Sequence, residues 1–524
     1  MKNGKTKKTG TKIAAVAAVL AAAALLVYFG IGSDRIMKLE PVPDNALVSK
    51  PTLNLWYTDE TLTDFLAEAA LDFSENSEVR VIPRLVSGLE YLESINEASL
   101  SSGMLPDVYI LGNDSLEKAW LSGLASEIRD TDGYVSEANF PETALRAVTY
   151  QGHIVGYPFY YETSALVYNL TYLREAAADQ LQVEADALAG QAAMAALDEN
   201  GEPVSGSEEQ GAAGQTDMQE DSASEDEEAV LARTEELIPA TVEDILTFAD
   251  GYNAPEKVEA VFRWDVSDIF YNYFFIGNYV DVGGTYGDDT EQIDIYNPDA
   301  IRCLTAYQEL TQFFSIDPDE VSYDSVMQEF LDGGLVFTMA TTDILSRLQE
   351  ASADGSFPYE YGTARVPDID EELATRSLSV TNAVVINGYS QKKDVANEFA
   401  RYLTQTAAEK LYESSGKLPA NSSVSLPAPQ AEAFAQEYAA SVPIPKMMAA
   451  SNYWVQMEIA FTRVWNGEEV SAVLQDISEQ IMTQVTGENY TEEYIAPPEE
   501  ESETAGQTEE GGAVMRQETE AVSG

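Results

Sequence analysis

The stretch Leu53-Asn54-Leu55-Trp56-Tyr57 is a short apolar run, and it begins a regular alternation of two patterns. Residues 61–73 follow with apolar side chains at helical spacing, and residues 79–85 form a second run typical of a strand. The alternation continues with a predicted helix over 90–101, a strand over 107–111 and a helix over 115–121. Strands that alternate with helices predict an α/β protein, in which helices cover a sheet.

The charge of the chain excludes several kinds of partner and site. Acidic residues outnumber basic ones by 90 to 29, and the formal net charge is −61. Such a charge repels phosphate backbones, so nucleic acid is excluded as the main partner. One histidine, His153, and one cysteine, Cys303, exclude a histidine-rich metal site and an internal disulfide. We expect no specific metal ion and no cofactor.

The N-terminal region has the pattern of a membrane segment. Residues 1–12 carry five lysines and no acid, and residues 13–32 carry no charge at all. A helix of that length spans about 30 Å, which is enough to cross a membrane. The excess of lysines places residues 1–12 in the cytoplasm and the body on the other side. The alternative is a cleaved secretory signal, which would leave the body secreted. Residues 33–50 form a polar spacer.

Two acidic segments interrupt the globular pattern. Residues 175–236 are dominated by alanine, glycine, serine, glutamine and acids, and they read as a low-complexity insertion. We expect its centre, residues 198–228, to be disordered and its alanine-rich edges to extend neighbouring helices. The tail, residues 495–524, is acidic again and is predicted to be unfolded. Thr241 is a candidate N-cap for the helix that resumes the fold.

Some polar residues lie where a ligand could reach them. Asn113 and Asp114 follow the strand at 107–111, and the carboxyl ends of such strands open into ligand crevices. The alternative is that Asp114 caps the next helix. Glu162 lies amid five aromatic residues, which suits a polyol because ring faces take C–H groups and a carboxylate accepts from hydroxyls. Aromatic residues are equally typical of a half-buried strand.

Two aromatic segments leave their role open. Residues 262–279 include Trp264 and Asp265 and could line a cleft or form a helical core. Tyr453 and Trp454 follow a loop that contains proline. The motifs of serine hydrolases, P-loop proteins and zinc proteases are missing from the sequence, and a single histidine largely removes the commonest general base at neutral pH. These features favour binding over catalysis.

The order of these segments resembles the extracellular solute-binding proteins of the maltose-binding type, the receptor components of carbohydrate importers powered by ATP hydrolysis. Four blocks carry the resemblance. They are PDVYILGND at 106–114, GHIVGYP at 152–158, FLDGGLVFTM at 330–339 and GKLPAN at 416–421. The third block matches the family's short helix, glycine turn and strand. With the residues around them, these blocks cover most of the body.

The resemblance implies an α/β, two-lobed periplasmic-binding-protein-like fold of type II, with the solute in an interlobe cleft and the N-terminal transmembrane helix before it. Lobe 1 would comprise residues 51–160 and 361–412, and lobe 2 residues 161–360 and 413–490. The chain would cross between the lobes near Tyr160, Tyr359 and Tyr412. The implied protein is a monomer without enzymatic activity, and its partners are a small solute and the membrane-embedded permease subunits of an ABC importer.

The resemblance also implies a set of ligand contacts. In this sequence the matching positions are Thr58, Asp59, Glu60, Asp114, Glu162, Trp264, Asp265, Thr341, Thr342, Asp343, Tyr453 and Trp454. Two stacking platforms of the maltose type are missing, because this chain has Leu111 at one position and the turn 341–343 at the other. These departures disfavour a maltodextrin as the ligand.

Two other functions remain open on the sequence. A surface protein could keep this fold for signalling or adhesion, without an importer. A carbohydrate-active enzyme could use two of the carboxylates, although paired acids carry little information in a chain that has 90 of them.

Overall fold

The computed structural model describes residues 50–101, 104–195 and 218–497. The predicted basic segment 1–12, the apolar segment 13–32 and the spacer up to residue 49 lie outside the described residues, as does the tail from residue 498. Within the part of the chain that is described, no helix combines the length and the apolar character needed to span a membrane.

The first part of the sheet follows the predicted alternation. β1 (Thr52–Tyr57) lies between β2 (Arg80–Leu85) and β3 (Val108–Gly112) and pairs with both in parallel. α2 (Thr63–Asn76) and α3 (Tyr91–Leu100) connect these strands, and α4 (Leu116–Leu121) follows β3. The strands and helices predicted between residues 53 and 121 are confirmed to within a few residues.

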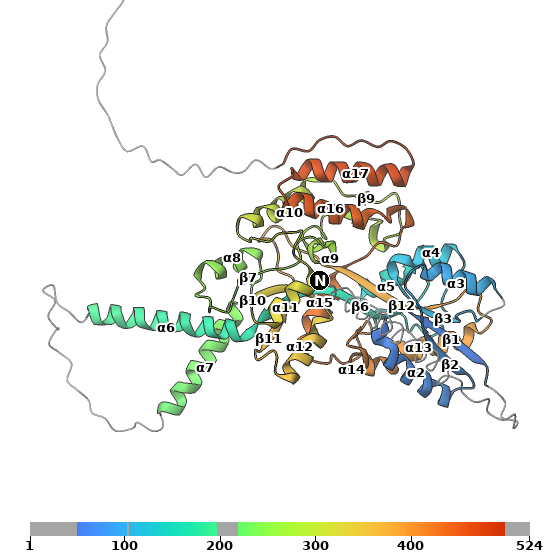
Figure 1. The fold of residues 1–524 in the computed structure, drawn as a ribbon, viewed down its shortest axis with the longest axis horizontal. Helices are drawn as coiled ribbons and strands as arrows, with labels where there is room; N and C mark the ends of the chain where they lie inside the picture. The colour runs from blue at the N-terminus through green and yellow to red at the C-terminus, as the bar shows by residue number, and fades with distance from the viewer. Residues whose placement is uncertain (1–49, 102–103, 196–217, 498–524) are drawn as a thin grey trace, which may run out of the picture. The chain divides into compact units, whose positions relative to one another are not determined.

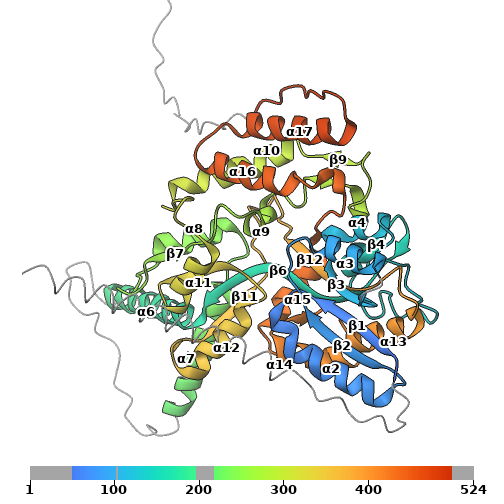
Figure 2. The same ribbon diagram turned by 45° about the vertical axis from the view of Figure 1, so that its right-hand side comes forward.

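One long strand belongs to both parts of the sheet. β6 (Tyr157–Asn169) pairs antiparallel with β12 (Leu378–Ile386) through its first half, and with β10 (Leu335–Thr341) and β11 (Tyr361–Ala364) through its second half. The sheet order is β2-β1-β3-β12-β6-β10-β7, where β7 is Ala260–Phe262. Figure 2 shows β6 passing between the group of β1, β2 and β3 and the strands β7 and β11.

A glycine turn leads into β10, as the sequence predicts. α11 (Tyr323–Leu331) ends just before Gly333, whose φ of +79° lies in the left-handed region. A Cβ at this position would come within 2.5 Å of the ring of Tyr359, so only glycine fits. The predicted order of helix, glycine turn and strand is therefore confirmed.

The start of the helix after the insertion is also confirmed. Thr241 Oγ1 accepts from the backbone N–H of Asp244 at 3.1 Å, and the Asp244 carboxylate accepts from the N–H of Thr241 at 2.8 Å. This reciprocal pair is a capping box, and it fixes the first turn of α8 (Val242–Gly251).

The remaining elements are helices and short strands. They are α5 (Glu142–Val148), β4 (Thr149–Tyr150), β5 (His153–Ile154), α9 (Ile269–Asn272), β8 (Asp281–Val282), β9 (Ile293–Asp294), α10 (Pro298–Glu309), α12 (Ile344–Asp354), α13 (Lys393–Thr404), α14 (Leu411–Ser415), β13 (Leu418–Pro419), α15 (Ala431–Ala440), β14 (Val442–Pro443), α16 (Tyr453–Trp465) and α17 (Val470–Thr486). Of the short strands, one pairs with β6 and one with β12 in the same sheet, and the other four form two separate two-stranded sheets.

Two large hydrophobic clusters hold these elements together. One contains Trp264, Tyr307 and Phe461 and joins the neighbourhood of β7 to α10, α16 and α17, three helices that lie side by side in Figures 1 and 2. The other contains Phe65 of α2 and Phe399 of α13 and continues through β6 to α11 and α12. Apolar packing therefore extends from one part of the sheet into the other.

The acidic insertion forms more helix than the sequence predicts. Its edges are helical as expected, in α6 (Leu170–Ala195) and α7 (Met218–Glu236). The expected disorder of residues 198–228 is wrong from Met218 onward, because alanine and glutamate are strong helix formers and Arg233 of α7 binds Glu184 of α6 at 2.8 Å. Figures 1 and 2 show α6 extending away from the sheet. Its described side chains are exposed from Gln182 onward.

Candidate functional site

A pocket of about 320 Å³ lies at the carboxyl ends of β1 and β3, beside the first half of β6. This is the edge where an open α/β sheet offers a ligand crevice. Five segments contribute to its lining. They supply Thr58 and Asp59 after β1, Tyr91 in α3, Gly112 and Ser115 at the end of β3, Tyr160 in β6 and Asn382 in β12. The predicted contacts Thr58 and Asp59 therefore line a pocket.

Lys417 brings two of the predicted residues together. Its Nζ lies 3.0 Å from Oδ2 of Asp59 and 3.0 Å from Oε1 of Glu162, and it lies 5.4 Å from the centre of the Tyr160 ring. Burial opposes the charge of the amine, but Glu162 and Asp59 hold the pKa of Lys417 above its ordinary value. We call Asp59, Glu162 and Lys417 the ion triad.

Asp59 is also held by its own helix turn. Its Oδ1 accepts from the backbone N–H of Thr61 at 3.0 Å and from the Thr61 hydroxyl at 2.7 Å. Burial alone would raise the pKa of Asp59, but these hydrogen bonds and the charge of Lys417 bring it below its ordinary value. Asp59 is therefore ionised and fixed in place. Glu60, the next residue, is exposed at the start of the 3₁₀ helix η1 (Glu60–Leu62).

The two polar residues after β3 have different surroundings. The Asp114 carboxylate lies against Gly112, and a Cβ added to Gly112 would come within 2.6 Å of Oδ1 of Asp114. Desolvation of this carboxylate raises the pKa of Asp114. Asn113 is buried, and both ends of its amide are used. Its Nδ2 donates to the Ile444 carbonyl at 2.7 Å, and its Oδ1 accepts from the N–H of Thr381 at 2.9 Å. The expectation that Asn113 reaches a ligand is wrong, because the backbone takes both of its hydrogen bonds.

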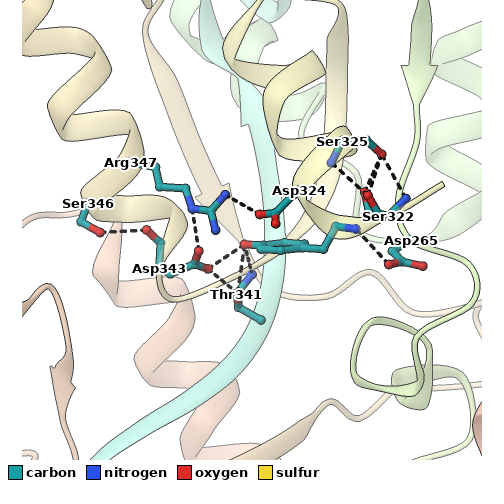
Figure 3. A network of polar contacts seen from close by, with 9 residues as sticks. Asp265, Ser322, Asp324, Ser325, Thr341, Asp343, Ser346 and Arg347 are labelled. Atoms are coloured by element: carbon teal, nitrogen blue, oxygen red, sulfur yellow. Dashed lines mark hydrogen bonds and ion pairs between the residues drawn. The ribbon is translucent and has the colours of Figure 1, made fainter. Parts of the chain in front are cut away.

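A second group of predicted residues meets at Tyr323 (Figure 3). The Tyr323 hydroxyl donates to Oδ1 of Asp343 at 2.7 Å and accepts from the N–H of Thr341 at 3.2 Å. The backbone N–H of Tyr323 donates to Oδ2 of Asp265 at 2.9 Å. Arg347 completes the network, with its Nε 2.8 Å from Oδ2 of Asp343. The turn after β10 is therefore held by side chains of the two flanking helices, Tyr323 of α11 and Arg347 of α12.

β6 connects the ion triad to the Tyr323 network. Thr341 of β10 pairs with Ser164, which lies two residues after Glu162. Because alternate residues of a strand share a face, Tyr160, Glu162 and Ser164 point to the same side of the sheet. Ser164 is fully buried, and its hydroxyl has no hydrogen-bond partner among the described residues.

The remaining predicted residues are partly or wholly in the core. Trp264 is fully buried, stacks on Phe262 at 4.6 Å between ring centres, and donates from its indole N–H to Asn272 at 2.8 Å. Thr342 and Tyr453 are also buried. Trp454 is half-buried against Tyr453 and Tyr273. We leave Trp264, Thr342 and Tyr453 out of the proposed site, since these three residues are at most 2% exposed.

A second and larger pocket, of about 1,120 Å³, lies between α12 and α14. Its lining includes Thr61, Gln349, Tyr361 and Tyr412. The Tyr412 hydroxyl donates to Oε1 of Gln349 at 3.3 Å, so the two helices are joined across it. No pattern in the sequence predicts this pocket.

Several residues at the site were missed by the sequence analysis. The period-2 pattern of β6 could have placed Tyr160 beside Glu162, since the two are two residues apart in one strand. No local pattern predicts the other three residues, because they lie in distant parts of the chain. They are Lys417, Tyr91 and Tyr323. Over the residues described, no group of three or more His, Cys, Asp or Glu side chains is arranged to hold a metal ion.

Comparisons with known proteins agree with this architecture. A family model described as "Bacterial extracellular solute-binding protein" matches residues 74–440. A search of curated proteins finds no match. Among solved structures, a cyclo/maltodextrin-binding protein complexed with maltotetraose is 19% identical, with a TM-score of 0.62, and the match covers 83% of this chain and 97% of that one.

Two further solved structures have a named source. An extracellular solute-binding protein from Staphylococcus aureus, in complex with maltose, is 17% identical with a TM-score of 0.62, over 83% of this chain and 98% of that one. A maltose-binding periplasmic protein from Listeria monocytogenes, also in complex with maltose, is 19% identical with a TM-score of 0.61, over 84% of this chain and 100% of that one. At these identities the likeness shows an α/β periplasmic-binding-protein-like fold.

Proposed function

Because the chain belongs to the bacterial extracellular solute-binding protein family, a family of non-enzymatic receptors, we propose that it captures a sugar or another polyhydroxylated solute. As a solute-binding protein of an ABC importer it acts on the extracytoplasmic side of the membrane, and we propose that it hands the solute to the permease subunits as a monomer.

The observation that carries this proposal is the chemistry around the first pocket. Asp59 and Tyr160 line this pocket, and Lys417 joins Asp59 to Glu162, which lies two residues after Tyr160 in β6. Carboxylates beside an aromatic face suit a polyol. The similar structures contain maltose or maltotetraose, which favours a carbohydrate. Leu111 and the turn 341–343 stand where the maltose type has two aromatic platforms, which disfavours a maltodextrin.

The proposed contacts come from both lobes. The first lobe would contribute Thr58, Asp59, Glu60 and Asp114, and the second lobe would contribute Glu162, Asp265, Thr341, Asp343 and Trp454. Residues 51–160 with 361–412 would move as one lobe against 161–360 with 413–490. A solute that contacts both lobes stabilises the closed state by its differential affinity for that state.

The attachment to the membrane belongs to the same proposal. Residues 13–32 would anchor the body, with residues 1–12 in the cytoplasm, and cleavage of that segment would leave the body secreted.

A thermal-shift screen of the full chain tests the function. The chain is kept in a detergent without a sugar headgroup, because maltoside detergents would compete with the solute. The probes are monosaccharides, oligosaccharides, polyols, amino acids and short peptides. A solute at 100 times its dissociation constant adds about 2.7 kcal/mol to the free energy of unfolding, which is seen as a rise in melting temperature.

The outcomes separate the open functions. A selective rise with a sugar supports the proposal, and recovery of that sugar unaltered excludes turnover. A rise with amino acids or peptides alone keeps the receptor and discards carbohydrate. No rise with any probe contradicts the proposal and favours a surface protein used for signalling or adhesion.

A further inference from the structure

We propose that Lys417 determines the specificity of the proposed solute site, by making it accept neutral polyhydroxylated solutes and reject cationic ones such as amino sugars. This inference rests on the proposed function, since it names the class of solute that the same site takes.

The geometry shows which acceptor atoms remain for a solute. Asp59 uses Oδ1 for Thr61 and Oδ2 for Lys417. Glu162 uses Oε1 for Lys417, and its Oε2 has no partner among the residues that the structure describes. The Glu162 side chain is 37% exposed, whereas that of Lys417 is 17% exposed. Glu162 Oε2 is therefore the acceptor that the triad leaves open to a hydroxyl group.

The charge of the triad explains the expected selectivity. Two carboxylates side by side would attract a protonated amine, but the Lys417 ammonium already occupies the position between them. A second ammonium brought by a solute would be repelled at short range by the first. An anionic solute is disfavoured as well, because two carboxylates outnumber one lysine. A neutral hydroxyl that donates to Glu162 Oε2 meets neither penalty.

The surroundings of Lys417 keep the amine charged and in place. Its amine is held by two segments, the turn after β1 through Asp59 and the middle of β6 through Glu162, and the Tyr160 ring lies 5.4 Å from its Nζ. The pKa of Lys417 is raised by Glu162 and Asp59 against the effect of burial. The charge on which the selectivity depends is therefore present at neutral pH.

Matched pairs of solutes test the inference. The probes are glucose with glucosamine, galactose with galactosamine, mannose with mannosamine, and N,N′-diacetylchitobiose with chitobiose, each measured by calorimetry on the full chain at pH 6, where the amines are protonated. We expect the wild type to bind at least one neutral form more than tenfold tighter than its amine. Equal or tighter binding of the amine overturns the inference.

Variants separate the charge of Lys417 from its packing. In Lys417→Gln we expect a loss of the preference for the neutral form, because the two carboxylates are then unpaired, while Lys417→Arg keeps the charge and the preference. Lys410→Gln removes the same charge from an exposed ion pair with Glu68 and is expected to behave like the wild type. A Lys417→Gln variant that keeps the full preference contradicts the inference.

The failures are distinguishable. If the Lys417→Gln variant does not fold, the wild-type comparison of each neutral form with its amine still decides. Binding of neutral and amino forms alike overturns only the role of Lys417. If the wild type binds none of these probes and none of those in the thermal screen, both the proposed function and this inference are overturned.

Discussion

Trp264 and Trp454 are both tryptophans at positions that the family resemblance marks as ligand contacts, but their surroundings differ. Trp264 is enclosed by Phe262, Phe314 and Trp465 and has no exposed surface. Trp454 keeps part of its ring at the surface beside Tyr273. A sequence position shows the residue type at a site, whereas the direction of the side chain depends on the packing around it.

We predict that Trp264→Ala lowers the free energy of unfolding by about 3–5 kcal/mol, because it removes a large core side chain and leaves a cavity. Trp454→Ala is expected to cost less stability and to weaken solute binding. Chemical denaturation measures the first effect and calorimetry the second. A Trp264→Ala variant that unfolds like the wild type would contradict the assignment of Trp264 to the core.

At the scale of elements, the end of β3 is tied to two other segments by one amide. Asn113 joins the backbone of β12 at Thr381 to the chain after β14 at Ile444. An aspartate in its place could still accept from the Thr381 N–H. It would also turn a carboxylate oxygen toward the Ile444 carbonyl, which then loses its donor.

We therefore predict that Asn113→Asp lowers the free energy of unfolding by about 1–3 kcal/mol, the cost of a buried acceptor left unsatisfied. Asn76→Asp makes the same chemical change at an exposed residue at the end of α2 and serves as the control. Equilibrium denaturation of both variants checks the prediction. Equal stability of the two would show that the Asn113 bonds contribute nothing.

The elements were more predictable from the sequence than the site. Local periodicity and turn residues define β1, α2 and β10, because each of these depends on its own neighbours in the chain. The ion triad depends on Asp59, Glu162 and Lys417, which are 358 residues apart at the extremes and meet only after the sheet has formed. Asn113 shows the same limit, since its role depends on Ile444, a residue 331 positions away.

At the scale of the whole molecule, the acidic insertion is separable from the fold. The described side chains of α6 are exposed from Gln182 onward, while Arg233 of α7 comes back to within 3.4 Å of Gln180. The two ends of the insertion therefore lie close together.

We predict that replacing residues 181–232 by a short Gly/Ser linker changes the free energy of unfolding by less than about 1 kcal/mol, because loop length and exposed ion pairs contribute little to stability. Solute affinity is expected to stay the same. Denaturation and calorimetry check the two statements. A loss of solute affinity in a variant that still folds would give the insertion a part in binding.

Lys446 links distant parts of the molecule through its buried amine. It is 1% exposed, and its Nζ donates to the carbonyl of Arg146 in α5 at 2.9 Å and to the carbonyl of Tyr286. Burial lowers the pKa of Lys446 from 10.5 to about 8, although Asp288 and Glu117 act in the opposite direction. Below pH 8 the folded state therefore carries the full cost of a buried charge.

We predict that this cost is relieved as the pH rises. Between pH 8 and about 10 the unfolded chain keeps the Lys446 proton while the folded chain loses it, so the unfolded state binds more protons and stability increases with pH. The free energy of unfolding of the wild type, minus that of Lys446→Met, is expected to rise by about 1.4 kcal/mol for each pH unit in this window and to be flat below it. Titrations of denaturant-induced unfolding at several pH values measure the difference, in which the other titrating groups cancel. Lys410→Met, at an exposed lysine, is expected to show no such rise, and a flat difference for Lys446→Met would mean that its amine is neutral or solvated in the folded protein.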